Sequence, residues 1–230
     1  MSKITVAIDG FSSTGKSTLA KRLASALGYV YIDTGAMYRA VTLFAMQHGL
    51  IVGGKIKKKG LIAMLDDIHL SFRFNEDFGF GEIYLNGKNV EKEIRSLEVS
   101  SQVSNVSSIS EVRKKLVQQQ QEMGKGKAIV MDGRDIGTVV FPDAELKFFL
   151  TASPEKRAVR RYKELLDRGD DVKYEAVLKN IQNRDYIDSH REDSPLVKAE
   201  DAVEIDNSDM GLTEQFERML SYANQIAETV

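Results

Sequence analysis

The stretch GFSSTGKS, residues 10–17, follows the short apolar run Ile4 to Ile8 and opens a helical pattern over Lys16 to Leu27. In this strand, loop and helix context, the pattern G-x-x-x-x-G-K-[ST] predicts a phosphate-binding loop. The two glycines allow the backbone to curl so that successive N–H groups point into one hollow. The start of the following helix adds its own N–H groups and the positive end of its dipole. The stretch therefore predicts binding of a nucleoside triphosphate.

Two side chains of this loop have specific expected roles. Lys16 should reach the β- and γ-phosphates, and the Ser17 hydroxyl should bind Mg²⁺. The alternative is a Gly/Ser-rich turn before an ordinary helix, which the flanking patterns disfavour. The predicted triphosphate-binding residues are Gly10, Phe11, Ser12, Ser13, Thr14, Gly15, Lys16, Ser17 and Thr18.

The composition is that of a globular protein of ordinary hydrophobicity. The chain has 230 residues, of which 42% are hydrophobic and 29% charged, and its net charge is −2. The absence of cysteine excludes disulfides and thiolate metal sites. A nucleic-acid binder usually has a basic excess, which this chain lacks. With no apolar signal or membrane-span pattern in the sequence, we expect a cytoplasmic monomer that binds neither nucleic acid nor membrane.

Five apolar runs alternate with helical patterns along the chain. They cover Ile4–Asp9, Tyr29–Asp33, Ala128–Met131, Leu146–Thr151 and Ala202–Ile205. This alternation predicts an α/β fold with a five-stranded parallel sheet and helices on both faces. Ligands of such sheets bind beyond the carboxyl ends of the strands. The loops after Asp9, Asp33 and Asp132 should therefore face one crevice.

The pattern changes between Gly49 and Gly126. His69–Phe74 and Glu82–Leu85 alternate like strands, and Asn86-Gly87 is a strong signal for a tight turn. These features predict a small antiparallel sheet inserted into the α/β domain. The basic run Lys55 to Lys59 is interpreted as a solvated loop, and residues 111–123 as a helix.

Two helices are predicted after the fourth strand, over Pro154 to Arg168 and Lys173 to Arg191. A last, structural helix begins at Thr213, with Phe216, Leu220, Ala223 and Ala227 on one stripe. The first two each carry charged side chains at helical spacing, so that these lie on one face. The alternative for both is a solvated face with weak ion pairs. These side chains are Arg157, Arg160 and Arg161 on the first helix, and Arg184, Asp188 and Arg191 on the second.

A surplus of arginines near the predicted loops narrows the class of triphosphate-binding protein. The guanine-reading Asn-Lys-x-Asp stretch of a GTPase is absent from the sequence, and the chain is short for a motor ATPase. A small-molecule kinase needs a second anion site for its acceptor and cations over the transferred group. Arginine suits both tasks because its fork donates two hydrogen bonds and keeps its charge.

Several motifs together resemble those of bacterial cytidylate kinases. They are GFSSTGKST, DTGAMYR at 33–39, EIR at 93–95, DGRDIGTVVFPDA at 132–144 and the RD…D…R series at 184–191. The resemblance spans nearly the whole chain, including the inserted sheet. The chain departs from it inside the phosphate loop, where many relatives have proline and further glycine or alanine in place of residues 11–14.

The resemblance implies a P-loop kinase domain over 1–230, with a nucleotide-binding insert at about 60–108 and a helical lid at about 154–192. It implies transfer of the γ-phosphoryl group of ATP to CMP or dCMP with Mg²⁺, with Lys16, Arg157 and Arg160 as catalytic residues. Arg39, Arg134 and Arg191 would bind the 5′-phosphate with Thr34 nearby, Arg184 and Asp188 the sugar, and Ser104, Arg113 and Asp135 the base. Asp132 is a second candidate for the metal, or would hydrogen-bond the phosphate loop.

The chemistry of the base agrees with these roles. A carboxylate such as Asp135 accepts a hydrogen bond from N4 of cytosine, and Arg113 can donate to N3 and O2. Uracil presents an acceptor at O4 and a donor at N3, so both contacts would be mismatched, and we expect a strong preference for cytosine.

Three alternatives to this function remain: a kinase for UMP, AMP or another small acceptor, a non-catalytic nucleotide sensor, and an RNA-associated protein that uses the lysines at 55–59.

Overall fold

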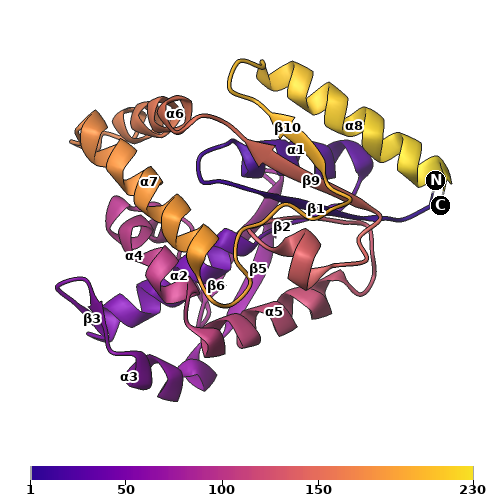
Figure 1. Cartoon of the computed structure of the whole chain (residues 1–230). Coiled ribbons are helices and arrows are strands. Elements are labelled where there is room, and N and C mark those ends of the chain that lie inside the picture. The colour runs from indigo at the N-terminus through magenta and orange to yellow at the C-terminus, as the bar shows by residue number, and fades with distance from the viewer. Residues whose placement is uncertain (1, 230) are drawn as a thin grey trace. The chain divides into compact units, whose positions relative to one another are not determined.

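The computed structural model describes residues 2–229, which form two compact units (Figure 1). The first unit contains the described residues up to Tyr31 and those from Gly124 onward. The second unit contains Ile32–Met123. Each unit is described by itself below.

A five-stranded sheet organises the first unit, in the order β10-β9-β1-β8-β2. The strand pairs β1–β8, β1–β9 and β9–β10 are all parallel, which confirms the predicted sheet type. The chain passes from the first unit to the second within β2. The strands are β1 (Thr5–Gly10), β2 (Val30–Asp33), β8 (Ile129–Asp132), β9 (Leu146–Thr151) and β10 (Val203–Asp206).

The register of the central strands brings their carboxyl ends together. Every residue of β1 and β8 is buried, as expected for strands covered on both faces. Ile8 pairs with Asp132, and Gly10 pairs with Leu150. The phosphate loop and Asp132 therefore leave the sheet from neighbouring strands at the same edge.

Four α-helices and a short π-helix complete the first unit. α1 packs against β1, β8 and α8, while α6 and α7 pack on each other as neighbouring rods (Figure 1). In α6, the Ser153 hydroxyl accepts a hydrogen bond from Lys156 N at 3.3 Å and Pro154 occupies the first turn. The helices are α1 (Lys16–Leu27), η3 (Ile136–Val140), α6 (Pro154–Asp167), α7 (Tyr174–His190) and α8 (Leu212–Thr229).

The last helix is structural, as predicted, although its buried stripe is displaced by one position. Ala223 and Ala227 are buried as expected, but Gln215 and Met219 occupy the buried positions of the first two turns. Phe216 is only half-buried, and the Arg22 guanidinium lies over its ring at 4.4 Å.

The second unit has one continuous hydrophobic core, formed largely by α2, α4, α5 and the inner face of β6. Its helices are α2 (Thr34–Gln47), α3 (Lys58–Ala63), η1 (Leu65–Asp67), η2 (Glu93–Arg95), α4 (Leu97–Ser107) and α5 (Ser110–Gly124). Its strands are β3 (Ile51–Val52), β4 (Lys55–Ile56), β5 (Leu70–Asn75), β6 (Phe80–Leu85) and β7 (Lys88–Asn89).

The predicted antiparallel sheet is present in this unit as β5-β6-β7. Asn86 and Gly87 join β6 to β7, both with positive φ, which is the conformation a tight hairpin turn requires. The interpretation of Lys55–Lys59 as a loop was wrong in part. Lys55 and Ile56 pair with β3, and α3 begins at Lys58, because Ile56 and Leu61 contribute to the apolar core.

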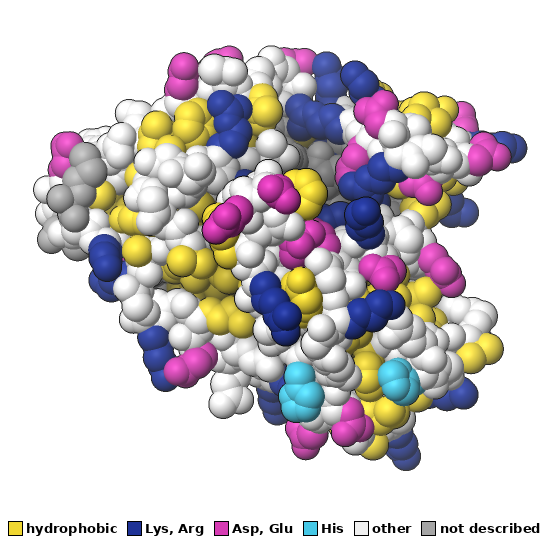
Figure 2. All heavy atoms as spheres, turned by 180° about the vertical axis from the view of Figure 1, so that it is seen from behind, with side chains coloured by type: hydrophobic (Ala, Val, Ile, Leu, Met, Phe, Trp, Pro, Cys, Tyr) yellow, Lys and Arg dark blue, Asp and Glu magenta, His cyan; other side chains and the backbone are white. Residues whose placement is uncertain are grey.

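Charges of both signs lie interspersed over the face that Figure 2 shows, in keeping with the balanced composition. Among the helices of residues 2–229, none has an apolar stretch long enough to cross a membrane.

Candidate active site

The backbone of the phosphate loop has the geometry that its glycines predict. Gly10 has φ +144°, and a Cβ there would lie 2.0 Å from the Leu150 carbonyl oxygen. Ser13 and Gly15 also have positive φ. Gly15 precedes α1 without contributing a side-chain cap, so the first N–H groups of this helix face the loop. Such an arrangement of N–H groups attracts an anion.

Lys16 lies within the loop with its side chain buried. Its ammonium donates to the Phe11 carbonyl at 2.5 Å and to the Thr14 hydroxyl at 3.4 Å. Burial lowers the pKa of Lys16 well below its usual value, and Arg134 lowers it further, against the opposing effect of Asp132. Phosphate groups would stabilise the charged form that this environment disfavours.

Ser17 and Asp132 form a pair at the adjoining ends of α1 and β8. The Ser17 hydroxyl donates to Asp132 Oδ2 at 2.9 Å, and the Tyr31 hydroxyl donates to Asp132 Oδ1 at 2.8 Å. A hydroxyl beside a carboxylate is a donor set that suits Mg²⁺. The part of the chain that the structure describes holds no cluster of three or more acidic or histidine side chains that could bind a metal.

The rest of the loop contacts the first unit in several ways. Phe11 is half-buried and packs edge-to-face on Phe149, with ring centroids 6.0 Å apart. Ser12 is buried, and its hydroxyl has no hydrogen-bond partner within residues 2–229. Thr18 lies exposed in the first turn of α1.

The charged residues after β8 and along α7 form a connected network. Arg134 Nε donates to Asp188 Oδ2 at 2.9 Å, and Arg191 Nη2 lies 3.9 Å from Asp135 Oδ1. Burial alone would raise the pKa of Asp188, but Arg134, Arg184 and Arg191 together hold it below its usual value. Asp188 is therefore a buried carboxylate whose ionised form is stabilised by three arginines. The structure thus brings together five of the predicted acceptor residues within the first unit.

Arg157 and Arg160 on α6 have distinct surroundings. Arg157 is 2% exposed, lies over the Phe11 ring and donates to the carbonyls of Ala152 at 2.8 Å and Ser12 at 3.3 Å. Its guanidinium also pairs with Asp185 Oδ2 at 2.7 Å. Arg160 is half-buried and donates to the side chain and carbonyl of Asn207. Arg161 pairs with Glu164 one turn along the same helix.

The second unit carries a separate arginine site at the start of α2. Asp33 caps this helix by accepting from Ala36 N at 2.8 Å, and its other oxygen accepts from Arg39 at 3.0 Å and Arg95 at 3.3 Å. A Cβ on Gly35 would lie 2.9 Å from the Arg39 guanidinium, so a larger residue there would displace the end of that side chain. The carboxylate holds two guanidinium groups side by side. The sequence left Arg95 without an assigned contact, because its partner Asp33 belongs to another motif and its partner Glu91 to none.

Three further predicted residues of the second unit are buried polar side chains. Thr34 begins α2, and Arg113 donates to the Ser107 carbonyl at 3.1 Å with its guanidinium over the Tyr38 ring. The Ser104 hydroxyl is buried on α4 and has no hydrogen-bond partner among the described residues. A buried hydroxyl without a partner is unusual in a folded protein and favours a ligand-binding role.

The structure also identifies two polar residues that the sequence did not single out. Asp9 accepts hydrogen bonds from the backbone N–H groups of Ile136 at 2.8 Å and Gly137 at 2.7 Å, so it fixes the segment that follows Arg134 and Asp135. Asn207 follows β10 and donates to the Thr14 carbonyl of the phosphate loop at 2.7 Å. Both lie at the carboxyl ends of strands, and this position is the sequence feature that could have identified them.

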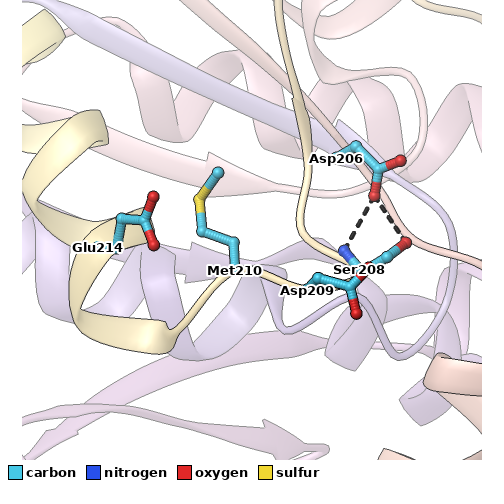
Figure 3. Close-up of a pocket in the computed structure, with 5 residues that line it drawn as sticks. All are labelled: Asp206, Ser208, Asp209, Met210 and Glu214. Carbon is cyan, nitrogen blue, oxygen red and sulfur yellow. Dashed lines mark hydrogen bonds between the residues drawn. The ribbon is translucent and has the colours of Figure 1, made fainter.

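A shallow pocket of about 300 Å³ is formed by the residues on either side of Asn207 (Figure 3). Asp206 accepts hydrogen bonds from the backbone N–H and hydroxyl of Ser208, which shapes the turn after β10. Met210 and Glu214 line the opposite side in the close-up. The pocket-lining turn is therefore continuous with the residue that contacts the phosphate loop.

Comparisons with known proteins agree with this geometry. Residues 6–225 match the family model described as cytidylate kinase. A cytidylate kinase of Flavobacterium johnsoniae is 64% identical over 228 residues, covering 99% of each chain, and one of Flavobacterium psychrophilum is 61% identical over 226 residues, covering 98% of this chain and 100% of the relative. Among solved structures, an uncharacterized protein from Eubacterium ventriosum aligns over 97% of this chain and 99% of its own. Its TM-score is 0.51 at 11% identity, so this likeness concerns the fold alone.

Proposed function

The chain belongs to the cytidylate kinase family, and on that premise we propose that it transfers the γ-phosphoryl group of ATP to CMP or dCMP. The products are ADP and CDP or dCDP. The observation that supports the proposal is the 2.9 Å contact of Ser17 with Asp132, which places the phosphate loop beside the segment that carries Arg134. A cation for the donor phosphates and a cation for the acceptor phosphate are therefore neighbours in one unit.

The reaction requires alignment and charge neutralisation more than proton transfer. An oxygen of the acceptor phosphate attacks the γ-phosphorus, and the bond from that phosphorus to the β–γ bridging oxygen breaks, so that ADP leaves with the electron pair. The attacking phosphate is already anionic, so a strong general base is unnecessary. Lys16 and Arg160 are proposed to neutralise the charge that moves between the phosphates, and Arg157 to hold the phosphate loop beside them.

Magnesium is proposed to bind at the Ser17 hydroxyl with the help of Asp132, whose 2.9 Å contact defines a pair of oxygen donors. When bound, the ion neutralises charge on the β- and γ-phosphate oxygens. Tyr31 holds the second Asp132 oxygen and so keeps the carboxylate turned toward Ser17.

Each unit contains a set of residues that we propose to contact the acceptor nucleotide. In the first unit, Arg134 and Arg191 would bind the 5′-phosphate, Arg184 and Asp188 the sugar, and Asp135 the base. In the second, Arg39 would bind the phosphate with Thr34, and Ser104 and Arg113 the base. The buried hydroxyl of Ser104 supports its assignment, since a cytosine edge would supply the missing hydrogen bond. The segments at about 60–108 and 154–192 keep their proposed roles as nucleotide-binding insert and lid, and the cytoplasmic, monomeric state stays a prediction.

The proposal is tested by steady-state kinetics with ATP, Mg²⁺ and a panel of CMP, dCMP, UMP and AMP, with ADP release coupled to a detectable reaction. We expect CMP and dCMP to be phosphorylated with a kcat/KM at least roughly a hundred-fold above that of UMP, because uracil leaves two buried polar groups unpaired. Equal turnover of CMP and UMP would contradict the assignment of Asp135 and Arg113. Nucleotide binding without any ADP release would favour the sensor instead.

A further inference from the structure

The carbonyl groups of the phosphate loop need hydrogen-bond donors from the surrounding protein. If its N–H groups converge on an anion, its carbonyl groups must point the other way, and buried carbonyls need hydrogen-bond donors. Three carbonyls of the loop have such donors in the structure. Phe11 O accepts from Lys16 and the Thr14 hydroxyl, Ser12 O accepts from Arg157, and Thr14 O accepts from Asn207.

Among these four donors, Asn207 alone is distant in sequence from the loop and also uncharged. Its backbone N–H donates to the Thr151 carbonyl at 2.9 Å, which continues the β9–β10 ladder by one residue. The side chain is 0% exposed. The sheet therefore fixes the position of the Asn207 amide, and the hydrogen bond from this amide to the Thr14 carbonyl fixes the position of the phosphate loop.

The hydrogen bonds of Asn207 determine which way its amide points. Arg160 can only donate, so Oδ1 must face Arg160 Nη1, 2.8 Å away. The Thr14 carbonyl can only accept, so Nδ2 must face it, and the second hydrogen of Nδ2 goes to Gln215 Oε1 at 2.8 Å. Arg160 Nη2 also donates to the Asn207 carbonyl at 2.6 Å. Every hydrogen-bonding atom of this buried side chain has a partner.

We propose that Asn207 is a positioning residue for phosphoryl transfer, which ties Thr14 of the phosphate loop to the Arg160 guanidinium through a single rigid amide. The proposal rests on the proposed function, since it takes ATP as the ligand of the loop and Arg160 as a cation near the transferred group. Asn207 itself touches neither reacting atom. It acts by fixing the distance between the loop that holds the phosphates and the arginine that neutralises them.

An amide is required here because no other side chain of this size offers a donor on one side and an acceptor on the other. Aspartate has the same shape and still accepts from Arg160, but it places an oxygen against the Thr14 carbonyl and Gln215 Oε1. Alanine removes both side-chain contacts and leaves only the contact of Arg160 with the backbone carbonyl. The two substitutions therefore separate the loop contact from the arginine contact.

The test uses the full-length enzyme with the variants Asn207→Asp and Asn207→Ala, assayed with ATP, Mg²⁺ and CMP. We expect Asn207→Asp to raise the KM for ATP about ten-fold, as the loss of one buried hydrogen bond implies, with the KM for CMP unchanged. We expect Asn207→Ala and Arg160→Ala to be non-additive, so that Arg160→Ala lowers kcat less in the Asn207→Ala background than in the wild type.

A matched control separates positioning from a general loss of stability. Gln120 is also a buried amide, 1% exposed, whose contact is with the sulfur of Met37 in the second unit. Gln120→Ala should lower the melting temperature as Asn207→Ala does, yet leave the KM for ATP unchanged. If Asn207→Asp does not fold, Gln215→Met serves instead, because it removes the acceptor that orients the Asn207 amide and should also raise the KM for ATP alone.

The outcomes distinguish this inference from the proposed function. A wild-type enzyme without CMP phosphorylation would refute the proposed function. An active wild type would overturn the role of Asn207 if its variants had an unchanged KM for ATP, if the KM for CMP rose equally, or if the effects of Asn207→Ala and Arg160→Ala on kcat multiplied. A selective rise in the KM for ATP together with non-additive kcat effects would support it.

Discussion

Lys16 is a residue whose function conflicts with its contribution to stability. Its folded-state pKa is well below 10.5 because of burial and the neighbouring Arg134. The folded protein therefore binds this proton less tightly than the unfolded chain, so stability rises with pH from the folded-state pKa up to about 10.5. At neutral pH the lysine costs stability.

We therefore expect Lys16→Met to raise the melting temperature at neutral pH while it lowers kcat by on the order of 10²–10³-fold. Differential scanning calorimetry at pH 7 and pH 10, together with the kinase assay, measures both effects. The gain in melting temperature should shrink at pH 10. A variant that is both less stable and fully active would refute this account.

Asp9 is expected to give stability the opposite dependence on pH. Burial raises its pKa from 3.8 to about 7, against the lowering effect of the Gly137 and Ile136 N–H groups. Between these two values the folded state binds a proton that the unfolded chain releases. Stability should therefore fall as pH rises from about 4 to about 7 and lose no more of this contribution above that range.

The Asp9→Asn variant should lack this dependence. In the wild type, a pKa shift of this size changes the free energy of unfolding by on the order of 4 kcal/mol. Its destabilisation relative to wild type should thus be larger at pH 5 than at pH 8, because only the wild type gains stability at the lower pH. Urea unfolding at the two values measures this difference. An equal free-energy difference at both would show that Asp9 is ionised throughout.

At the scale of elements, the turn from β1 into the phosphate loop depends on a residue without a side chain. Gly10 combines φ +144° with a β9 carbonyl at 2.0 Å from any added Cβ, so backbone would have to move to admit even a methyl group. Because Gly10 pairs with Leu150 in the sheet, a shift there moves both the strand and the loop.

We expect Gly10→Ala to lower the free energy of unfolding by roughly 2–4 kcal/mol and to weaken ATP binding. Chemical denaturation and titration with a fluorescent ATP analogue measure the two effects. Gly126→Ala is the matched control, because an added Cβ there meets no atom within 4 Å. Equal stability of the two variants would contradict the close approach at Gly10.

At the scale of the whole molecule, the proposed acceptor residues are divided between the two units. Arg39 and Arg113 belong to residues 32–123, whereas Arg134 and Arg191 belong to the unit that carries the phosphate loop. Each set is expected to become more ordered within its own unit when CMP binds.

Hydrogen–deuterium exchange with and without CMP tests this expectation. CMP should slow exchange of amides near the start of α2 and in the segment after β8, while an ATP analogue alone should protect residues 10–18. Protection by CMP that is confined to one unit would remove the other unit's residues from the acceptor site.

The sequence predicted local features accurately because their signals are local. The loop at residues 10–17, the parallel strands and the Asn86-Gly87 turn each follow from residue types a few positions apart. The errors arose where packing decides. Ile56 joins the apolar core, so part of a basic run is strand and helix, and Gln215 occupies a position in α8 that an apolar pattern assigns to its neighbour.

By itself, then, the sequence determined that this protein has a phosphate-binding loop on a parallel sheet and a set of arginines suited to a second phosphate. The tertiary structure alone decided which side chains hold these groups in place. Asn207 reaches Thr14 across 193 residues, Asp9 reaches Gly137 and Tyr31 reaches Asp132. The physical reason is that such partners are chosen by strand order and register, which depend on the packing of the whole sheet rather than on any local pattern.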